Sequence, residues 1–262
     1  MRIKKGLEKK LVAATITIAL IIGIVFLVQL KKNVDDFDFD AKYSVAANEI
    51  KYNNVEGYIA RPTKIGTFPG VVMIHEWWGL NENIKEMAEK LASQGYVVLA
   101  VDLFNGKVAQ NSQEALEMVS SLNKEEAIEN MKDAVSFLKD KQDVSGVASL
   151  GWCFGGGQSL QLSLNENLDA TVIYYGSLVT EQQELSKIES PVLGIFGAED
   201  TSIPVESVYQ FETALNELGI ENEIYIYDGV GHAFANPSGM NYAPEETKDA
   251  WQKTLSFLEK NL

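Results

Sequence analysis

Five nearly continuous apolar runs, separated by stretches with a different rhythm, organise the chain beyond about residue 70. They are GVVMIH (70–75), YVVLAVD (96–102), VASLGW (147–152), ATVIYYG (170–176) and PVLGIFG (191–197). Runs of this length without polar alternation are typical of strands that are buried on both faces. Upstream, two short alternating segments surround an Asn-Asn pair between residues 48 and 62, and they predict an antiparallel hairpin.

Apolar residues at helical spacing fill the intervals between several of these runs. One such segment follows Asn81 and ends before Gly95, a second follows Pro204 and ends before Gly219, and a third begins at Pro244. Strands that alternate with helices imply right-handed crossovers and a mostly parallel sheet that is covered on both faces. The pattern therefore predicts a three-layer α/β fold, in which the chemistry lies at the carboxyl ends of the strands.

The composition favours one large domain. With 262 residues, of which 46% are hydrophobic, the chain is long enough for a single well-filled core. It has one cysteine, so no intrachain disulfide can form. Beyond residue 32, 15 Lys and Arg residues stand against 36 Asp and Glu residues. Such an acidic surface repels nucleic acid, which is therefore not expected as a partner.

The first 44 residues depart from this pattern. Residues 1–10 are basic, residues 11–30 carry no charge, and residues 31–44 form an acidic tether, which leaves 45–262 as the folded domain. An uncharged helix as long as 11–30 rises about 30 Å, the thickness of a bilayer core. We therefore predict a transmembrane helix and a membrane-anchored, single-pass protein whose catalytic domain is extracytoplasmic, because more basic residues precede the span than follow it. A cleaved signal peptide and a buried core helix are the alternatives.

The single cysteine, Cys153, follows an apolar run in the sequence GWCFG. This is the nucleophile-elbow pattern with cysteine in place of serine. An elbow turns so sharply that the positions two residues before and after the nucleophile must lack side chains, and Gly151 and Gly155 meet that need. The pattern thus indicates a reactive thiol at the start of a helix. A lone cysteine can also be a small, inert core residue.

Two later strand ends supply partners for this thiol: Asp200 in GAED and His232 in GHAF. The imidazole can accept the thiol proton, and the carboxylate can orient the imidazole and stabilise its charged form. Taken singly, Asp200 could cap a helix and His232 could be a structural hydrogen-bonding residue. The order nucleophile, acid, histidine is that of α/β-hydrolases, and it favours a Cys-His-Asp triad.

These motifs, together with HEWWGL after the first central strand, give residues 45–262 a resemblance to dienelactone hydrolase, also called carboxymethylenebutenolidase. The resemblance implies an α/β-hydrolase fold and hydrolysis of a small ester or lactone through a thioester acyl-enzyme, without metal or cofactor. The sequence also shows no cluster of His and carboxylate residues at metal-binding spacing. The predicted membrane anchor is a departure from the soluble members that the family leads one to expect.

The resemblance also implies roles for residues around the triad. Glu76 falls on the family's active-site glutamate, which shares a proton with the nucleophilic cysteine. The backbone N–H groups of Trp77 and Phe154 match the oxyanion hole. Candidate substrate contacts are the side chains of Trp78, Phe104, Lys107, Phe234 and Asn236. The tryptophans and Phe234 could instead be core residues.

The family's carboxylate-binding arginines are absent. One would lie in the stretch DLFNGK, where Lys107 is the nearest cation, and the other lies four residues after the triad histidine, where this chain has Asn236. A neutral or different ester or lactone therefore suits the sequence at least as well as a carboxylated dienelactone. Two other functions remain open: a broad carboxylesterase or thioesterase with the same triad, and a non-catalytic thiol redox sensor.

Overall fold

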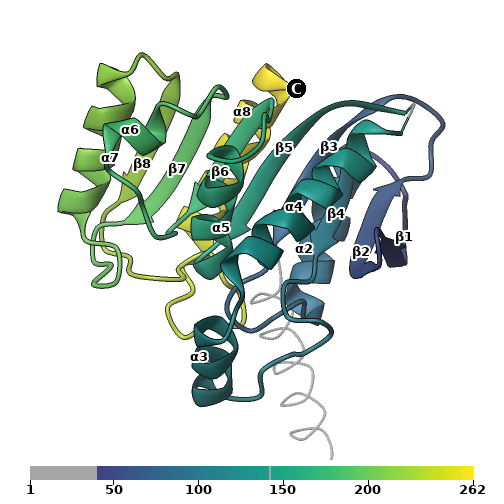
Figure 1. The fold of residues 1–262 in the computed structure, drawn as a ribbon, viewed down its shortest axis with the longest axis horizontal. Coiled ribbons are helices and arrows are strands. Elements are labelled where there is room, and N and C mark those ends of the chain that lie inside the picture. Colours follow the sequence, from purple (N-terminus) through teal and green to yellow (C-terminus); the bar gives the residue numbers. More distant parts are fainter. Residues whose placement is uncertain (1–39, 142) are drawn as a thin grey trace, which may run out of the picture. The chain divides into compact units, whose positions relative to one another are not determined.

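The apolar runs form the centre of an eight-stranded sheet in the part of the chain that this computed structural model describes, residues 40–141 and 143–262 (Figure 1). The strands are β1 (Val45–Tyr52), β2 (Val55–Pro62), β3 (Phe68–Ile74), β4 (Val97–Val101), β5 (Val144–Trp152), β6 (Ala170–Tyr174), β7 (Val192–Gly197) and β8 (Asn222–Tyr227). The helices are α2 (Glu82–Ser93), α3 (Ser112–Ser120), α4 (Lys124–Lys139), α5 (Phe154–Ser163), α6 (Gln182–Leu185), α7 (Val205–Glu217) and α8 (Pro244–Asn261). Together they belong to one compact unit, Asp40–Leu262.

The sheet is mostly parallel, as the sequence predicts. Its strand order is β1-β2-β4-β3-β5-β6-β7-β8, with β3 to β8 parallel and β1 and β2 antiparallel to their neighbours. Ile74 at the end of β3 pairs with Val101 of β4 and with Gly151 of β5. The carboxyl ends of these central strands therefore lie side by side at one edge, where the residues that follow them can meet.

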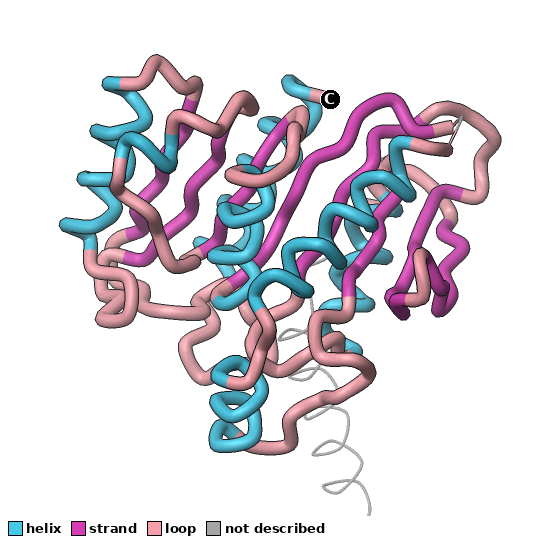
Figure 2. Tube along the Cα trace, viewed as in Figure 1, coloured by secondary structure: helices cyan, strands magenta, loops and turns pink. Residues whose placement is uncertain are grey.

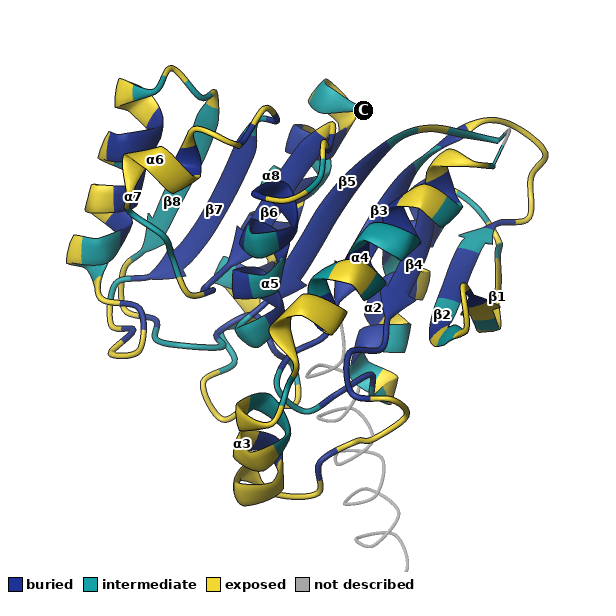
Figure 3. Cartoon of the chain, in the orientation of Figure 1, coloured by how far each residue is buried: buried dark blue, intermediate teal, exposed yellow. Residues whose placement is uncertain are grey.

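Helices cover both faces of the sheet. On one face, α4 buries Met131, Val135 and Leu138 against β3, β4 and β5, while α5 and α7 pack against β6 and β7. On the other face lie α2 and α8, and Thr254 of α8 forms a hydrogen bond with Tyr174 of β6. Each fully buried side chain of this size stabilises the fold by about 1.5–3 kcal/mol. Figure 3 shows the result: the central strands are buried, and the outer sides of α4 and α7 are exposed.

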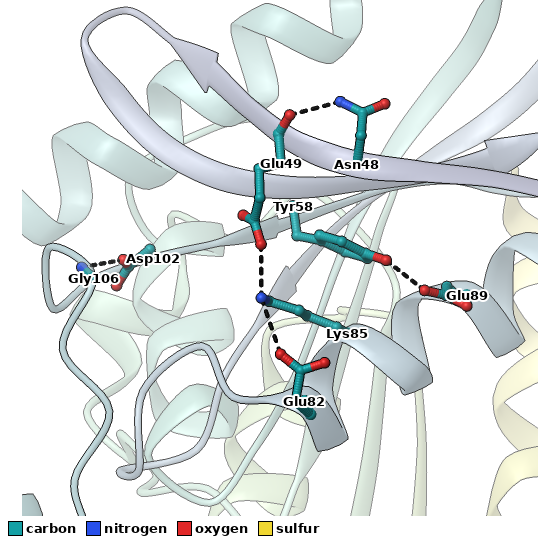
Figure 4. Close-up of polar contacts among 8 residues, drawn as sticks. All are labelled: Asn48, Glu49, Tyr58, Glu82, Lys85, Glu89, Asp102 and Gly106. Carbon is teal, nitrogen blue, oxygen red and sulfur yellow. Dashed lines mark hydrogen bonds and ion pairs between the residues drawn. The ribbon is translucent and has the colours of Figure 1, made fainter.

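The predicted hairpin is present as β1 and β2. Its turn is formed by Asn53 and Asn54, both with positive φ, which asparagine tolerates better than most residues. Polar contacts fasten the hairpin to α2 (Figure 4): Lys85 donates to Glu49 of β1, and Tyr58 of β2 donates to Glu89. These contacts are largely exposed to solvent, so they orient the hairpin more than they stabilise it.

Several elements are not among the sequence predictions. Strand β8 alternates polar and apolar residues and is half-buried along its length, so it lacks the continuous apolar run of the central strands. Helix α4 is capped by Asn123, whose side chain accepts from the N–H groups of Glu125 and Glu126. Helix α3 buries only Ala115. It lies beyond the carboxyl edge of the sheet, among the long loops of that edge (Figure 2).

The transmembrane helix in the predicted fold class is wrong. Among residues 40–141 and 143–262, no helix combines the length and the apolar character that crossing a bilayer requires. The physical reason is that these helices are amphipathic. Helix α8 spans 18 residues and buries Trp251 and Phe257, but it also carries charged residues such as Lys253.

The segment predicted as an anchor, 11–30, lies outside the described residues. The predicted single-pass, membrane-anchored and extracytoplasmic localisation is corrected on the same finding, and the described residues give no support to the membrane as a partner. The fold class that the structure supports is the α/β-hydrolase type with a mostly parallel sheet.

Candidate active site

Cys153 occupies a strained turn between β5 and α5. Its φ is 54° and its ψ is −117°, a conformation that residues with side chains rarely adopt. A Cβ atom on Gly151 would overlap the carbonyl oxygen of Gly155, and a Cβ atom on Gly155 would overlap the carbonyl oxygen of Ile74. Glycine is therefore required at both positions, and the turn has the geometry that the GWCFG pattern predicts.

The surrounding backbone holds this turn in place. The N–H group of Cys153 donates to the carbonyl oxygen of Tyr174 at 3.0 Å, which ties the elbow to the end of β6. Phe154 is the first residue of α5, so its N–H group has no partner within the helix. The thiol is half-buried, and it lies at the positive end of the α5 dipole.

His232 brings the thiol and a carboxylate into one chain of contacts. Its Nε2 atom lies 3.1 Å from Sγ of Cys153, and its Nδ1 atom lies 2.7 Å from Oδ2 of Asp200. The loop that carries His232 is held by Asn241, whose side-chain amide donates to the His232 carbonyl oxygen. The three residues that the sequence selects from separate strand ends are thus brought together.

The surroundings of Asp200 and His232 favour a positively charged imidazole ring, which lies between the Asp200 carboxylate and the Cys153 sulfur. The other oxygen of Asp200 accepts from the N–H groups of Ser202 and Ile203. Burial by itself would raise the pKa of Asp200, but the hydrogen bonds from His232 and from these two N–H groups lower it. Burial by itself would lower the pKa of His232, but its hydrogen bonds with Asp200 and Cys153 raise that pKa to about 10.

Glu76 follows β3 and is buried in the same region. Its carboxyl oxygen Oε2 accepts a hydrogen bond of 2.5 Å from the side-chain amide of Asn236. Burial raises the pKa of Glu76 to about 7, although His232 and Asn236 act in the opposite direction. A carboxyl group with a pKa near neutrality can hold or release a proton during turnover, which is the property that acid–base catalysis needs.

Two other polar residues at strand ends have structural roles. His75 is fully buried, and its Nε2 atom accepts from the N–H group of Leu103, so Nδ1 carries the proton and donates to the Glu76 carbonyl oxygen. Burial lowers the pKa of His75, which keeps the ring neutral. Asp102 accepts from the N–H groups of Phe104 and Gly106, which closes the loop after β4. None of these hydrogen bonds of His75 and Asp102 involves the thiol of Cys153.

The candidate substrate contacts are distributed differently from the sequence expectation. Trp78 is half-exposed and packs edge to face on Trp77, with ring centroids 5.0 Å apart. Phe234 is fully buried against Tyr175 and Tyr227, and Phe104 is buried against His75 and Phe154. Asn236 is buried as the partner of Glu76. Of the five, the structure brings only Trp78 and Lys107 to the surface.

Lys107 borders a cavity away from the triad. This cavity has a volume of about 520 Å3 and is lined by the loop after β4, the end of α3 and the start of α4. Cys153, His232, Asp200 and Glu76 do not line it. The described residues contain no group of three or more His, Cys, Asp or Glu side chains that could hold a metal ion.

Sequence reasoning did not select Tyr175, which adjoins the site. It is the residue directly after β6, it is fully buried, and its ring packs edge to face on the His232 imidazole with centroids 5.3 Å apart. Its place at a strand end was a signal of the kind that identified the other residues. Because it lies within an apolar run, it is indistinguishable in sequence from a core aromatic residue.

The sequence of this chain is similar to those of known proteins. Residues 55–262 match the model of the "Dienelactone hydrolase family". The chain is 30% identical over 228 residues to the "Putative carboxymethylenebutenolidase" of Saccharolobus solfataricus, an alignment that covers 72% of this chain and 88% of that protein. It is 32% identical over 219 residues to "Protein usf" of Aquifex pyrophilus, covering 79% of this chain and 94% of that protein.

Solved structures show the same fold. The crystal structure of a "Putative Dienelactone Hydrolase" from Klebsiella pneumoniae superposes with a TM-score of 0.76 at 26% identity, and covers 82% of this chain and 99% of that one. Acylaminoacyl peptidase of Pyrococcus horikoshii superposes with a TM-score of 0.65 at 14% identity, covering 84% of this chain and 42% of that one. The second likeness concerns the fold alone.

Proposed function

Because this chain belongs to the dienelactone hydrolase family and is accordingly a hydrolase of ester or lactone bonds, we propose that Cys153 is its nucleophile. The observation that carries the proposal is the continuous contact from the thiol through the imidazole of His232 to the carboxylate of Asp200. A nucleophile, a base within hydrogen-bond reach and a group that orients the base are the parts that covalent acyl transfer needs.

Acylation follows from this arrangement. Cys153 attacks as the thiolate, its proton having passed to Nε2 of His232, and the sulfur forms a bond to the carbonyl carbon of the ester or lactone. The negative charge that develops on the carbonyl oxygen is stabilised by the backbone N–H groups of Trp77 and Phe154. When the tetrahedral intermediate collapses, His232 returns the proton to the leaving oxygen, and a thioester remains on the enzyme.

Deacylation uses the same groups in reverse. His232 accepts a proton from a water molecule, whose oxygen attacks the thioester carbon, and the protonated imidazole then returns a proton to the departing sulfur. The short bond to Asp200 stabilises the charged imidazole in both steps, which agrees with the raised pKa of His232. Glu76, which is buried and interacts electrostatically with His232, can hold or release a proton near this pair.

The substrate that this site suits best is a small ester or lactone without a carboxylate near the acyl group. Arg61 is the single arginine of the described residues, and it pairs with Asp143, before β5, rather than with any residue of the site. The position four residues after His232 holds the neutral Asn236. A carboxylated lactone would find no paired, charge-assisted hydrogen bonds of the kind that arginine provides. This favours a broad carboxylesterase or thioesterase range over strict dienelactone specificity.

Mass spectrometry of the acyl-enzyme tests both the mechanism and the substrate class. The full chain is exposed briefly to a panel of esters, thioesters and lactones, acid-quenched and digested. The expected result is an acyl group on the peptide that contains Cys153, formed with neutral substrates and absent in Cys153→Ala. Hydrolysis without any adduct on Cys153, or with an adduct on another residue, would refute the thiol mechanism.

A further inference from the structure

Tyr175 is held in an unusual position beside the triad. It has a φ of 35°, which is rare for a bulky residue, and its N–H group donates to the carbonyl oxygen of Ile195 at 2.7 Å. Its ring is enclosed by the His232 imidazole and by Phe234, both in edge-to-face contact. Residues held in such sparsely populated backbone conformations cluster at active sites.

The hydroxyl group of Tyr175 lacks a partner in the protein. Among the described residues, it is the one buried side-chain N or O atom without a hydrogen bond. The N–H group of Ala235 moderates the pKa of the phenol, but its geometry is not that of a hydrogen bond. An N–H group could in any case satisfy only the oxygen and not the phenolic proton. A buried O–H donor without an acceptor is costly, so its retention needs a reason.

A small cavity is lined by both Tyr175 and Glu76. Its volume is about 10 Å3, which is about the space that one water molecule occupies. Tyr175, Glu76 and Asn236 supply the polar part of its lining, together with Asn83 of α2. The rest of the lining is Ile84, Met87, Trp152 and Ala235. A water molecule in such a space needs two to four polar partners, and these side chains provide them.

Glu76 is the group in this cavity that most needs a further donor. Its Oε2 atom accepts from Asn236, whereas an ionised carboxylate has about four acceptor sites. The titratable groups that interact with it are His232 after β8 and Tyr175 after β6, with His75 adjacent in sequence. Cys153 after β5 interacts with Tyr175. Helix α2 contributes Asn83, Ile84 and Met87 to the cavity and no titratable side chain.

We propose that Tyr175 is a positioning residue for Glu76: one water molecule in this cavity accepts the phenolic O–H and donates to the Glu76 carboxyl group, and so stabilises its ionised form. This inference rests on the proposed function, in which Glu76 can hold or release a proton near His232 and Cys153. Burial and the nearby acids Glu76 and Cys153 raise the pKa of Tyr175 well above its usual value, so the phenol remains a donor.

The test is a titration of Glu76 itself in the full chain. The infrared band of its protonated carboxyl group, identified as the difference between the wild-type protein and Glu76→Gln, is followed against pH. Tyr175→Phe is expected to raise the pKa of Glu76 by about one pH unit, because the phenol no longer holds the water molecule that donates to the ionised carboxylate. An unchanged midpoint would overturn the proposal. No turnover is needed for this measurement.

Tyr174→Phe is the matched control. Tyr174 is equally buried and adjacent in sequence, but its hydroxyl bonds to Thr254 of α8. Its removal is expected to lower thermal stability and to leave the titration of Glu76 unchanged. The same shift in both variants would show that the effect is one of general packing, and it would overturn the proposal.

Kinetics give a second readout. In Tyr175→Phe, the apparent pKa of the limb of the kcat/KM–pH profile that reports Glu76 should rise by the same amount. When Glu76→Gln is already present, adding Tyr175→Phe should leave the apparent pKa values of the profile unchanged. A shift that persists without Glu76 would overturn the proposal. Failure to form an acyl group on Cys153 would instead refute the proposed function and leave the infrared result intact.

A crystal structure of the wild-type protein keeps the inference testable even if Tyr175→Phe does not fold. It is expected to show an ordered water molecule within hydrogen-bond distance of both the Tyr175 oxygen and the Glu76 carboxyl group. A direct bond from Tyr175 to another acceptor would overturn the proposal.

Discussion

The side-chain amide of Asn236 donates a hydrogen bond to the carboxyl group of Glu76, although 160 residues separate them in the sequence. Asn236 is itself held by Ser238, whose N–H group and hydroxyl both donate to its amide oxygen. The carboxyl group is thus held by a neutral donor, at a position where the resemblance noted above leads one to expect an arginine. A neutral partner leaves the pKa of the buried Glu76 raised, at about 7.

Replacing Asn236 by a cationic residue is expected to change both the pKa of Glu76 and the substrate preference. In Asn236→Arg, the guanidinium should lower the pKa of Glu76 and offer paired hydrogen bonds to an anionic substrate. The ratio of kcat/KM for an ester with a free carboxylate to that for its neutral analogue should rise about tenfold. Asn236→Met, of comparable length but uncharged, is the control. An equal change in both variants would rule out a charge effect.

The thiol and the imidazole are expected to be indispensable. Cys153→Ala and His232→Ala should each reduce kcat for ester hydrolysis by about 10⁴ or more, since members of a nucleophile–base pair fail together. Circular dichroism and thermal melting should remain close to the wild type. Ser207→Ala, in α7, should retain full activity because, among the described residues, this hydroxyl bonds only to the carbonyl oxygen of Pro204. Near-normal turnover in either site variant would exclude the triad.

The elbow glycine is expected to be essential for folding rather than for chemistry alone. Gly151→Ala should destabilise the protein by about 3 kcal/mol or more, because its Cβ atom would overlap the backbone of Gly155. At Gly66 the nearest atom to a new Cβ is 3.5 Å away, so Gly66→Ala should change stability by less than about 0.5 kcal/mol. Urea unfolding measures both. Similar stabilities would contradict the packing argument.

The bond between His232 and Asp200 predicts a pH dependence of stability. The pKa of His232 is raised to about 10 in the folded state, above its usual 6.5, so the folded protein holds this proton more tightly. The resulting stabilisation is fully present below about pH 6.5 and is lost as the pH rises through about 10. In Asp200→Asn this decline should be smaller. Denaturant unfolding at pH values between about 6.5 and 10 measures this decline in the wild type and in Asp200→Asn. An equal decline in both proteins would contradict a stabilising bond between His232 and Asp200.

The catalytic unit is expected to be separable. A chain that begins at Asp40 contains the whole described sheet together with Cys153, Asp200 and His232. It should therefore fold and hydrolyse the same ester with an unchanged kcat/KM. Thermal melting and kinetics beside the full chain provide the comparison. A loss of folding or a large fall in kcat/KM would mean that residues before Asp40 are needed.

The central architecture and the candidate site residues were accessible from the sequence because both depend on local signals. A strand buried on both faces must be apolar along its length, and the five runs became strands β3 to β7. Parallel strands end at a common edge, so residues that follow them meet there. This is why Cys153, Asp200 and His232 could be selected before their distances were known. Strand β8 was not predicted because an edge strand alternates polar and apolar residues. The predicted membrane span lies outside the described residues, and no helix among those residues could cross a bilayer.

What only the tertiary structure decided is which side chains face one another. Phe234 and Asn236 lie on the same loop as His232, yet the fold buries the first among aromatic rings and turns the second onto Glu76. The unpaired hydroxyl of Tyr175 and the cavity that this residue lines are likewise invisible in the sequence. Such contacts join residues up to 160 positions apart, and they depend on how helices and loops pack onto the sheet, which no local periodicity records.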